Sequence, residues 1–149
     1  MRTIVFALAL TAAAGAGCAK SNSDKPAPAS DNAPAVKADK PTIATVTPDQ
    51  LDQAIAKGDC QAVDANGDGT RKQMGVVPGA VLLTSSMDYK LSELPSDKSK
   101  GLVFYCANTS CGASHMAADR ALEAGYVNVK VMPQGIAGWV SSGKKVQTI

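Results

Sequence analysis

The run of residues 101–106, "GLVFYC", constrains the fold of this chain more than any other feature. It is apolar without alternation, which is typical of a strand that other elements cover on both faces of a sheet. A short polar loop follows, and then an alanine-rich pattern, "SHMAADRALEAG", at 114–125. This pattern predicts a helix that begins at a Ser114 cap, packs small residues against the sheet and ends at Gly125.

Strand and helix patterns alternate along the rest of the region from 42 to 149. Thr47-Pro48 is typical of a helix cap followed by proline in the first turn, and it opens a helix pattern at 48–57. Because the patterns alternate, the sequence predicts an α/β fold with a parallel β-sheet flanked by helices on both faces. The expected strands are 42–47, 60–66, a segment of 75–83 after a turn at Pro78-Gly79, 101–106 and 127–132, and a short closing helix contains Trp139.

The chain begins with a pattern typical of an export signal. Arg2 supplies a positive start, and the apolar run 4–14 is shorter than the roughly 20 residues that a membrane-spanning helix needs. Residues 1–17 are therefore predicted to be a secretory signal peptide.

Gly17-Cys18 is similar to a bacterial lipobox, which predicts lipidation of Cys18. The alternative is ordinary cleavage after the small residues 14–16. Residues 18–41 are rich in Pro, Ala, Ser, Asp and Lys and are predicted to form a disordered tether. The chain is thus expected to be exported to the periplasm and held by a lipid anchor, with one folded domain at 42–149.

The charge of the chain is nearly balanced. The net charge is +2, from 15 basic and 13 acidic residues, and the basic residues are dispersed. This gives no electrostatic reason to bind nucleic acid or an anionic membrane surface. We expect no nucleic-acid partner, and membrane contact only through the lipid anchor.

Cys106 ends the most apolar strand, and the loop behind it leads into a helix. Ligands of parallel sheets bind beyond the carboxyl ends of strands, and the N–H groups of a helix N-terminus favour an anion. This position predicts a lowered pKa and a nucleophilic thiolate at Cys106. Cys60 begins a strand, so it should lie about 15 Å away at about 3.3 Å per residue and stay unpaired. Cys106–Cys111 is the one pairing that we expect.

From Cys60 to Val146 the sequence resembles a single rhodanese-like domain. The matching motifs are "AVDAN" at a strand end, the turn "GVVPGA", the strand "VFYC" and the closing "GIAGW" and "GKKV". The resemblance implies that Cys106 accepts a sulfane sulfur as a persulfide and passes it to a nucleophile. It also implies a structural role for Asp64, and a cradle around the cysteine formed by the amides of Ala107, Asn108, Thr109, Ser110 and Gly112.

The loop departs from the rhodanese-like pattern in its charge. It contains no Arg or Lys to hold thiosulfate, and Asn66, Val76 and Ala113 stand where basic residues or histidine are common. The sequence does not place Arg71 and Lys72 relative to the loop. We therefore expect poor sulfur transfer from thiosulfate to cyanide.

The loop is also longer than the commonest rhodanese form, as in phosphatases that share the architecture. Phosphatase chemistry needs an Arg six positions after the cysteine, and that position is Gly112. The second thiol offers different chemistry, because Cys111 could attack a persulfide, sulfenate or mixed disulfide on Cys106.

Two functions remain open at this point. The first is a sulfurtransferase or thiol redox relay that uses Cys106 as nucleophile and Cys111 as resolving thiol, with a small sulfur donor or a thiol acceptor, including a protein, as partner. The second is a catalytically inactive binding module with a structural Cys106–Cys111 pair. In both we expect a monomer with no cofactor and no metal ion.

Three other features are interpreted as structural. "DANGDGT" at 64–70 is similar to the start of an EF-hand loop, but Gly75 stands where the last ligand should be. His115 is interpreted as a solvated helix residue rather than a proton shuttle. Met132 and Trp139 are expected to lie in the core.

Overall fold

The structure is a computed structural model, and it describes residues 42–149. The predictions for residues 1–41, including the signal peptide, the tether and Cys18, lie outside the described residues. The elements are β1 (Ala44–Thr45), α1 (Pro48–Ala56), β2 (Cys60–Asp64), α2 (Asp68–Met74), β3 (Val81–Leu82), the 3-10 turn η1 (Leu91–Glu93), β4 (Gly101–Tyr105), α3 (Ala113–Glu123), β5 (Val129–Met132) and α4 (Gly135–Ser141).

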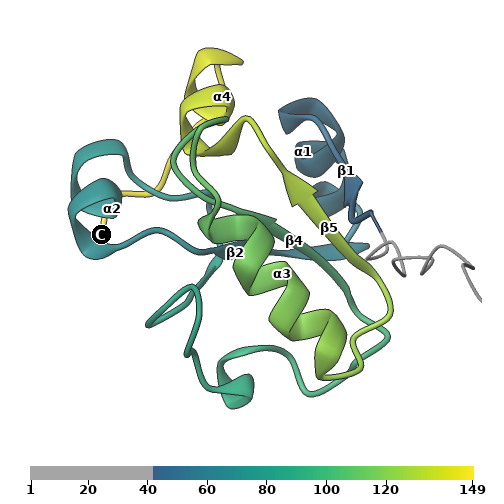
Figure 1. The fold of residues 1–149 in the computed structure, drawn as a ribbon. Helices are drawn as coiled ribbons and strands as arrows, with labels where there is room; N and C mark the ends of the chain where they lie inside the picture. The colour runs from purple at the N-terminus through teal and green to yellow at the C-terminus, as the bar shows by residue number, and fades with distance from the viewer. Residues whose placement is uncertain (1–41) are drawn as a thin grey trace, which may run out of the picture. The chain divides into compact units, whose positions relative to one another are not determined.

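The five strands form one parallel sheet with the order β1-β5-β4-β2-β3 (Figure 1). β4 is the central strand, as its apolar run predicted, and it pairs with β2 on one side and β5 on the other. The register places Asp64 opposite Tyr105, and Tyr105 opposite Met132. Since the strands are parallel, their carboxyl ends meet at one edge of the sheet. The predicted fold class is confirmed.

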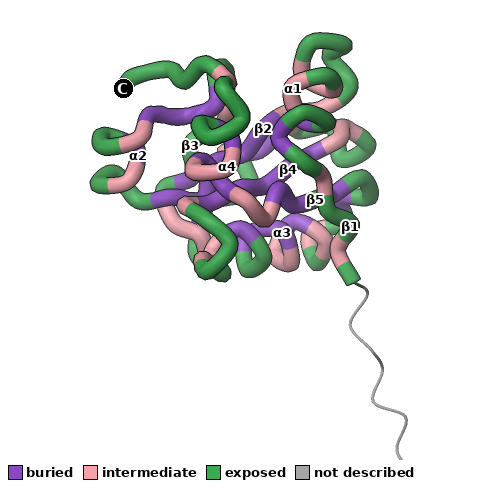
Figure 2. The backbone as a smooth tube through the Cα atoms, turned by 90° about the horizontal axis from the view of Figure 1, so that it is seen from above, coloured by how far each residue is buried: buried purple, intermediate pink, exposed green. Residues whose placement is uncertain are grey.

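Alternate residues of β4 enter two separate cores. Leu102 and Phe104 pack with the small residues of α3, whereas Val103 and Tyr105 pack on the face that α1 and α4 cover. Figure 2 shows that the buried backbone is concentrated in the middle strands and in the segments that lie against them. Met132 is fully buried and Trp139 is 2% exposed, so both belong to the core as predicted. Helices therefore cover both faces of the sheet.

Helix α2 is absent from the predicted elements. The residues around Gly67 and Gly69 read as a turn, but a helix begins at Asp68 and ends at Met74. The prediction failed here because this short helix is held by a tertiary contact. Arg71 turns inward, is only 5% exposed and donates to the backbone oxygen of Leu83 at 2.8 Å.

Helix α3 begins one residue earlier than predicted, and Ser114 is not its cap. Gly112 occupies the N-cap position, and no side chain caps the helix. Ser114 lies inside the first turn and is 1% exposed. Its side chain faces Cys106, the first residue of the loop that precedes the helix. The end of the helix is as predicted, because Gly125 follows it with φ +91°.

The C-terminal segment folds back over α1 and α2. Gln147 forms an antiparallel bridge with Val76, and the Trp139 indole donates to the backbone oxygen of Lys145 at 2.8 Å. Lys144 pairs with two acidic residues of α1, Asp49 at 2.9 Å and Asp52 at 2.7 Å. Within residues 42–149, no helix has the length and apolar character that crossing a bilayer requires.

Candidate functional site

The candidate site is the loop of residues 106–112, which connects β4 to α3 at the carboxyl edge of the sheet. The start of α4 holds the first two residues of this loop. The amide of Ile136 donates to the Cys106 oxygen at 2.8 Å, and the amide of Ala137 donates to the Ala107 oxygen at 3.0 Å. Gly135 makes this approach possible, since a Cβ there would lie 2.5 Å from the Cys106 oxygen. Its φ of +61° also favours glycine.

Cys106 is buried and its thiol is already hydrogen-bonded. The residue is 1% exposed, and its Sγ donates to the backbone oxygen of Cys111 at 3.0 Å. The hydroxyl oxygen of Ser114 lies 3.3 Å from the same sulfur. Burial raises the pKa of Cys106, and the Cys111 thiol raises it further, while hydrogen bonds from Ser114 offset this in part. The prediction of a lowered pKa was wrong, because burial outweighs the helix N-terminus.

Cys111 has the opposite environment. It is partly exposed at the edge of the loop. Partial burial opposes its charged form, but hydrogen bonds from the Cys106 thiol and from the amides of Ala107 and Ala113 outweigh burial and lower the pKa of Cys111. The more acidic thiol of the loop is therefore its second cysteine. Cys60, Cys106 and Cys111 are all free thiols in this structure.

Two amides of the loop, those of Ser110 and Cys111, bond within the loop and not to Cys106. The amide of Ser110 donates to the side-chain oxygen of Asn108 at 3.0 Å, and the amide of Cys111 donates to the backbone oxygen of Asn108 at 3.1 Å. Asn108 thus closes the loop on itself, as asparagine commonly does in tight turns. Asn108, Thr109 and Ser110 are exposed at the tip of the loop, and Gly112 is exposed at its end.

Behind the loop lies a buried polar group built from three elements. Asp64, at the end of β2, is fully buried and accepts from the amide of Asn66 at 2.6 Å and from Arg71 Nε at 3.4 Å. The Tyr105 hydroxyl accepts from the amide of Val77 at 3.0 Å. Burial raises the pKa of Tyr105 far above its usual range, and the nearby Asp64 carboxylate contributes. These contacts fix the strand ends from which the loop starts.

No basic side chain from this buried group serves the loop. Arg71 directs its donors to Asp64, to the backbone oxygen of Leu83 and to Asp68 at 3.4 Å. Lys72 is exposed on the same helix. Arg71 therefore does not serve the loop, and it stabilises the fold around the strand ends.

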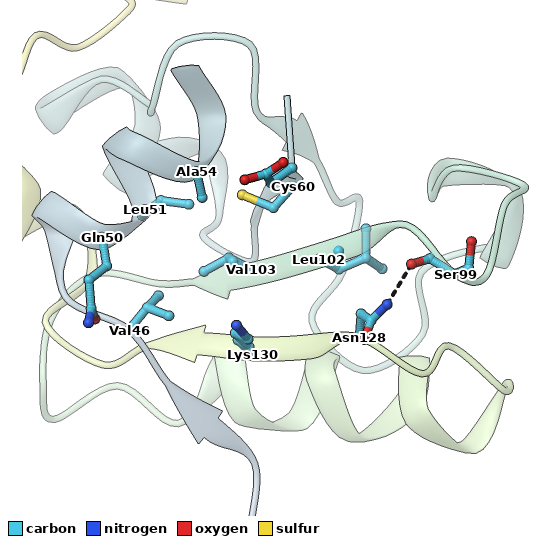
Figure 3. A pocket seen from close by; sticks show the side chains of 12 residues that line it. Val46, Gln50, Leu51, Ala54, Cys60, Ser99, Leu102, Val103, Asn128 and Lys130 are labelled. Carbon is cyan, nitrogen blue, oxygen red and sulfur yellow. Dashed lines mark hydrogen bonds between the residues drawn. The ribbon is translucent and has the colours of Figure 1, made fainter. Parts of the chain in front are cut away.

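Cys60 lies at the opposite edge of the sheet, where it pairs with Gly101. Figure 3 shows its sulfur close to Ala54 of α1, in an open groove of about 400 Å³ over the amino ends of the strands. Burial raises the pKa of Cys60. Because Cys60 pairs with the first residue of β4 and Cys106 follows the last, the two thiols lie at opposite ends of the strands, as the sequence predicted.

The remaining sequence features do not converge on the loop. His115 is exposed in the first turn of α3. Asp64 of the EF-hand-like stretch is buried against Arg71, whereas Asp68 lies largely in solvent. Among residues 42–149, no cluster of three or more His, Cys, Asp or Glu side chains could hold a metal ion.

Sequence reasoning missed two residues that shape the site. Gly135 sets the contact between α4 and the loop, and Asn108 closes the loop turn. A signal for both existed: glycine directly before an apolar helix pattern, and asparagine in a run of small residues. What the sequence could not supply was the partner of each residue.

Comparisons with solved structures agree with this architecture. A protein from Bacillus halodurans superimposes with a TM-score of 0.61 at 21% identity, over 70% of this chain and 77% of that one. The rhodanese-like domain of an Anabaena protein gives a TM-score of 0.57 at 18% identity, over 72% and 81%. A thiosulfate sulfurtransferase from Pseudomonas aeruginosa gives 0.60 at 17% identity, over 71% of this chain and 20% of that one. At these identities the likeness shows a shared fold.

No curated protein matches the chain. The family model described as "Rhodanese-like domain", however, matches residues 47–142, which include every strand after β1 and all four helices. With the parallel sheet and a cysteine loop between β4 and α3 in place, the match settles the family: the chain belongs to the rhodanese-like domain proteins.

Proposed function

We propose that this protein carries sulfur or exchanges disulfides through the two thiols of its loop. The observation that supports this best is the contact between the Cys106 thiol and the backbone of Cys111. The Cys106 thiol donates to the backbone oxygen of Cys111 at 3.0 Å, and it also interacts with the Cys111 side chain. Two thiols held this closely in one loop, at the edge where ligands of parallel sheets bind, suit a reaction that ends in a disulfide between them.

The chemistry proceeds in two exchange steps. One loop thiolate attacks the outer sulfur of a persulfide R–S–SH, so that the donor leaves as R–S⁻ and the loop carries a cysteine persulfide. The second thiol then attacks the sulfur of the first cysteine, and hydrosulfide leaves as the loop disulfide forms. A disulfide R–S–S–R reacts in the same way. The first thiolate attacks it, R–S⁻ leaves and a loop cysteine carries a mixed disulfide; the second thiol then attacks that cysteine, and the other R–S⁻ leaves as the loop disulfide forms.

The charges around the loop favour a donor with little negative charge. The loop has no Lys or Arg, and Arg71 is engaged with Asp64 and Leu83. Thiosulfate, with two negative charges, would lose much of its hydration here without gaining a cationic partner. We therefore propose an organic persulfide or a disulfide as substrate, in preference to thiosulfate.

Sulfide release from the reduced full chain tests this function. Glutathione persulfide should release close to one sulfide per chain and leave a Cys106–Cys111 disulfide, with thiosulfate far less effective. The Cys60→Ser variant is the matched control and should behave as the wild type, because Cys60 lies at the other edge of the sheet. If the wild type releases no more sulfide than the Cys106→Ser/Cys111→Ser double variant, sulfur transfer is wrong, and if it also fails to exchange a disulfide, the function as a whole is wrong.

A binding module is the second candidate, and one observation favours it. Cys106, the residue that the resemblance makes catalytic, is 1% exposed and its pKa is raised by burial. A silent domain would use the loop as a surface for a partner protein. Failure of sulfide release and of disulfide exchange, with the fold intact, would support this candidate.

We further propose that the protein works outside the cytoplasm, where an oxidised loop can persist. The support is the pattern of residues 1–18, with Cys18 at the expected cleavage point. The intact mass of the protein from membranes of a bacterial host should show loss of residues 1–17 and a gain of lipid, and the Cys18→Ser variant should lack the lipid. An unmodified Cys18 would contradict the anchor.

A further inference from the structure

We propose that Cys111, and not Cys106, takes the sulfur atom from the donor, and that Cys106 is the resolving thiol. This inference rests on the proposed function and assigns the order of its two steps. It reverses the order that the resemblance to rhodanese-like domains implies. Three features of the loop carry it.

The first feature is access. Cys106 is 1% exposed beneath the loop, whereas Cys111 is partly exposed beside the exposed residues Ser110 and Gly112. A persulfide donor must bring its outer sulfur into line with the attacking sulfur. Of the two loop thiols, Cys111 is thus the one that a donor larger than a water molecule can reach in this conformation.

The second feature is the position of the proton. The Cys106 Sγ lies 3.0 Å from the backbone oxygen of Cys111, a contact that an S–H group makes as a donor. A thiolate at the same place would face the lone pairs of a carbonyl oxygen and repel it. The geometry therefore holds Cys106 in its protonated form, which is a poor nucleophile.

The third feature is the hydrogen bonding of Cys111. Hydrogen bonds from the Cys106 thiol and from the backbone amides of Ala107 and Ala113 lower the pKa of Cys111. Backbone donors that converge on one atom stabilise a negative charge there. The amide donors of Ala107 and Ala113 thus favour the ionised form of the second cysteine of the loop.

The order of bond changes follows from these features. The Cys111 thiolate attacks the outer sulfur of R–S–SH, a Cys111 persulfide forms and R–S⁻ leaves. Cys106 then attacks the Cys111 sulfur and its proton goes to the leaving hydrosulfide, so that hydrogen sulfide departs. The transferred sulfur is reduced to sulfide, while the two cysteine sulfurs are oxidised to a disulfide.

Partial alkylation of the reduced wild-type chain tests the order without any substitution. Both cysteines lie in the tryptic peptide 101–120, between cuts after Lys100 and Arg120, and fragment masses distinguish them. Limiting iodoacetamide at neutral pH should label Cys111 about tenfold or more faster than Cys106, because exposure and thiolate fraction both favour it. Equal labelling, or faster labelling of Cys106, would overturn the proposal.

Single variants test the order with the sulfur donor. After glutathione persulfide, Cys106→Ala should keep one extra sulfur atom on Cys111 and release no sulfide, because no resolving thiol is left. Cys111→Ala should load several-fold more slowly. The opposite pattern, a stable persulfide in Cys111→Ala and none in Cys106→Ala, would overturn the order; near-UV circular dichroism confirms that each variant is folded.

The two proposals can fail separately. If neither the wild type nor a variant takes up sulfur or exchanges a disulfide, the proposed function is wrong, yet the alkylation ratio still decides which loop thiol is the reactive one. If the wild type releases sulfide and Cys106 loads first, the function stands and the order is wrong.

Discussion

Cys106 and Cys111 share one short loop, yet their surroundings shift the pKa values of the two thiols in opposite directions. Burial decides the outcome at Cys106, whereas hydrogen-bond donors decide it at Cys111. Closeness to a helix N-terminus therefore does not by itself predict which of the two thiols has the lowered pKa. It predicts where an anion is favoured, and the side-chain packing decides which sulfur takes that place.

The pH at which Cys111 becomes reactive should depend on the presence of Cys106. A lowered pKa keeps Cys111 partly ionised below about pH 8.5, the ordinary midpoint of a thiol. Cys106→Ala removes one of the donors that lower the pKa of Cys111, so the midpoint of Cys111 alkylation should move to higher pH. Alkylation rates measured from acidic to alkaline pH report the shift, and Cys60→Ser should leave the midpoint unchanged. A midpoint that moves to lower pH in Cys106→Ala would contradict this electrostatic account.

Gly135 should be one of the least replaceable residues near the loop. A Cβ at this position would meet the Cys106 oxygen at 2.5 Å and the backbone of Ala107 at 2.6 Å, on a residue with φ +61°. Gly135→Ala should lower the free energy of unfolding by about 1–3 kcal/mol for the backbone strain alone, and more for the clash.

Gly143→Ala is the matched control for that change. Gly143 also has a positive φ, of +73°, but within the described part of the chain no other atom would lie within 4 Å of a Cβ added there. Urea unfolding of both variants separates strain from clash. Equal losses in the two variants would mean that the contact between α4 and the loop does not matter for stability.

At the scale of elements, the sequence predicted what its local pattern could encode. β4 and α3 were predicted nearly to their ends, because an unbroken apolar run and a stripe of alanines leave few alternatives. Helix α2 was missed, because its stability comes from Arg71 reaching Asp64 and Leu83, which lie outside the helix. The residue pattern within 68–74 does not predict that contact.

Arg71 should therefore matter more than any other charged residue of α2. Arg71→Met leaves the fully buried Asp64 carboxylate without its cationic partner, which should cost about 3–5 kcal/mol of unfolding free energy. Lys72→Met, one residue away on the exposed side of α2, should change stability by less than about 0.5 kcal/mol. Similar losses in both variants, measured in urea, would show that the ion pair does not hold α2.

At the scale of the molecule, the fold and the place of the site could be predicted, but the internal arrangement of the site could not. Parallel strands bring all carboxyl ends to one edge, so Cys106 had to lie there. The turn made by Asn108 and the contact of Gly135 depend on how the loop packs, which no local pattern encodes. These contacts decide how deep each thiol lies and which amides face it.

The last six residues should stabilise the whole domain from outside the matched family region. Val146 packs against Gly75, Gln147 pairs with Val76 and the Lys145 oxygen accepts from Trp139. A chain that ends at Gly143 should unfold at lower urea concentration and show red-shifted fluorescence of its only tryptophan, which is 2% exposed in the full chain. Deletion of Ile149 alone, an exposed residue, is the control. An unchanged spectrum in the longer truncation would contradict this role.

The contact of Ile136 and Ala137 with the carbonyl groups of Cys106 and Ala107 also has a consequence in time. Ribosomes make the chain from its N-terminus, so all three cysteines of the domain exist before α4, the helix that fixes the loop of Cys106 and Cys111. An oxidant that reaches the nascent domain before α4 has formed meets three thiols, Cys60, Cys106 and Cys111, whose pairing is not yet fixed by the fold. Once α4 has formed, its contact with the loop holds Cys106 and Cys111 together, apart from Cys60 at the other edge of the sheet.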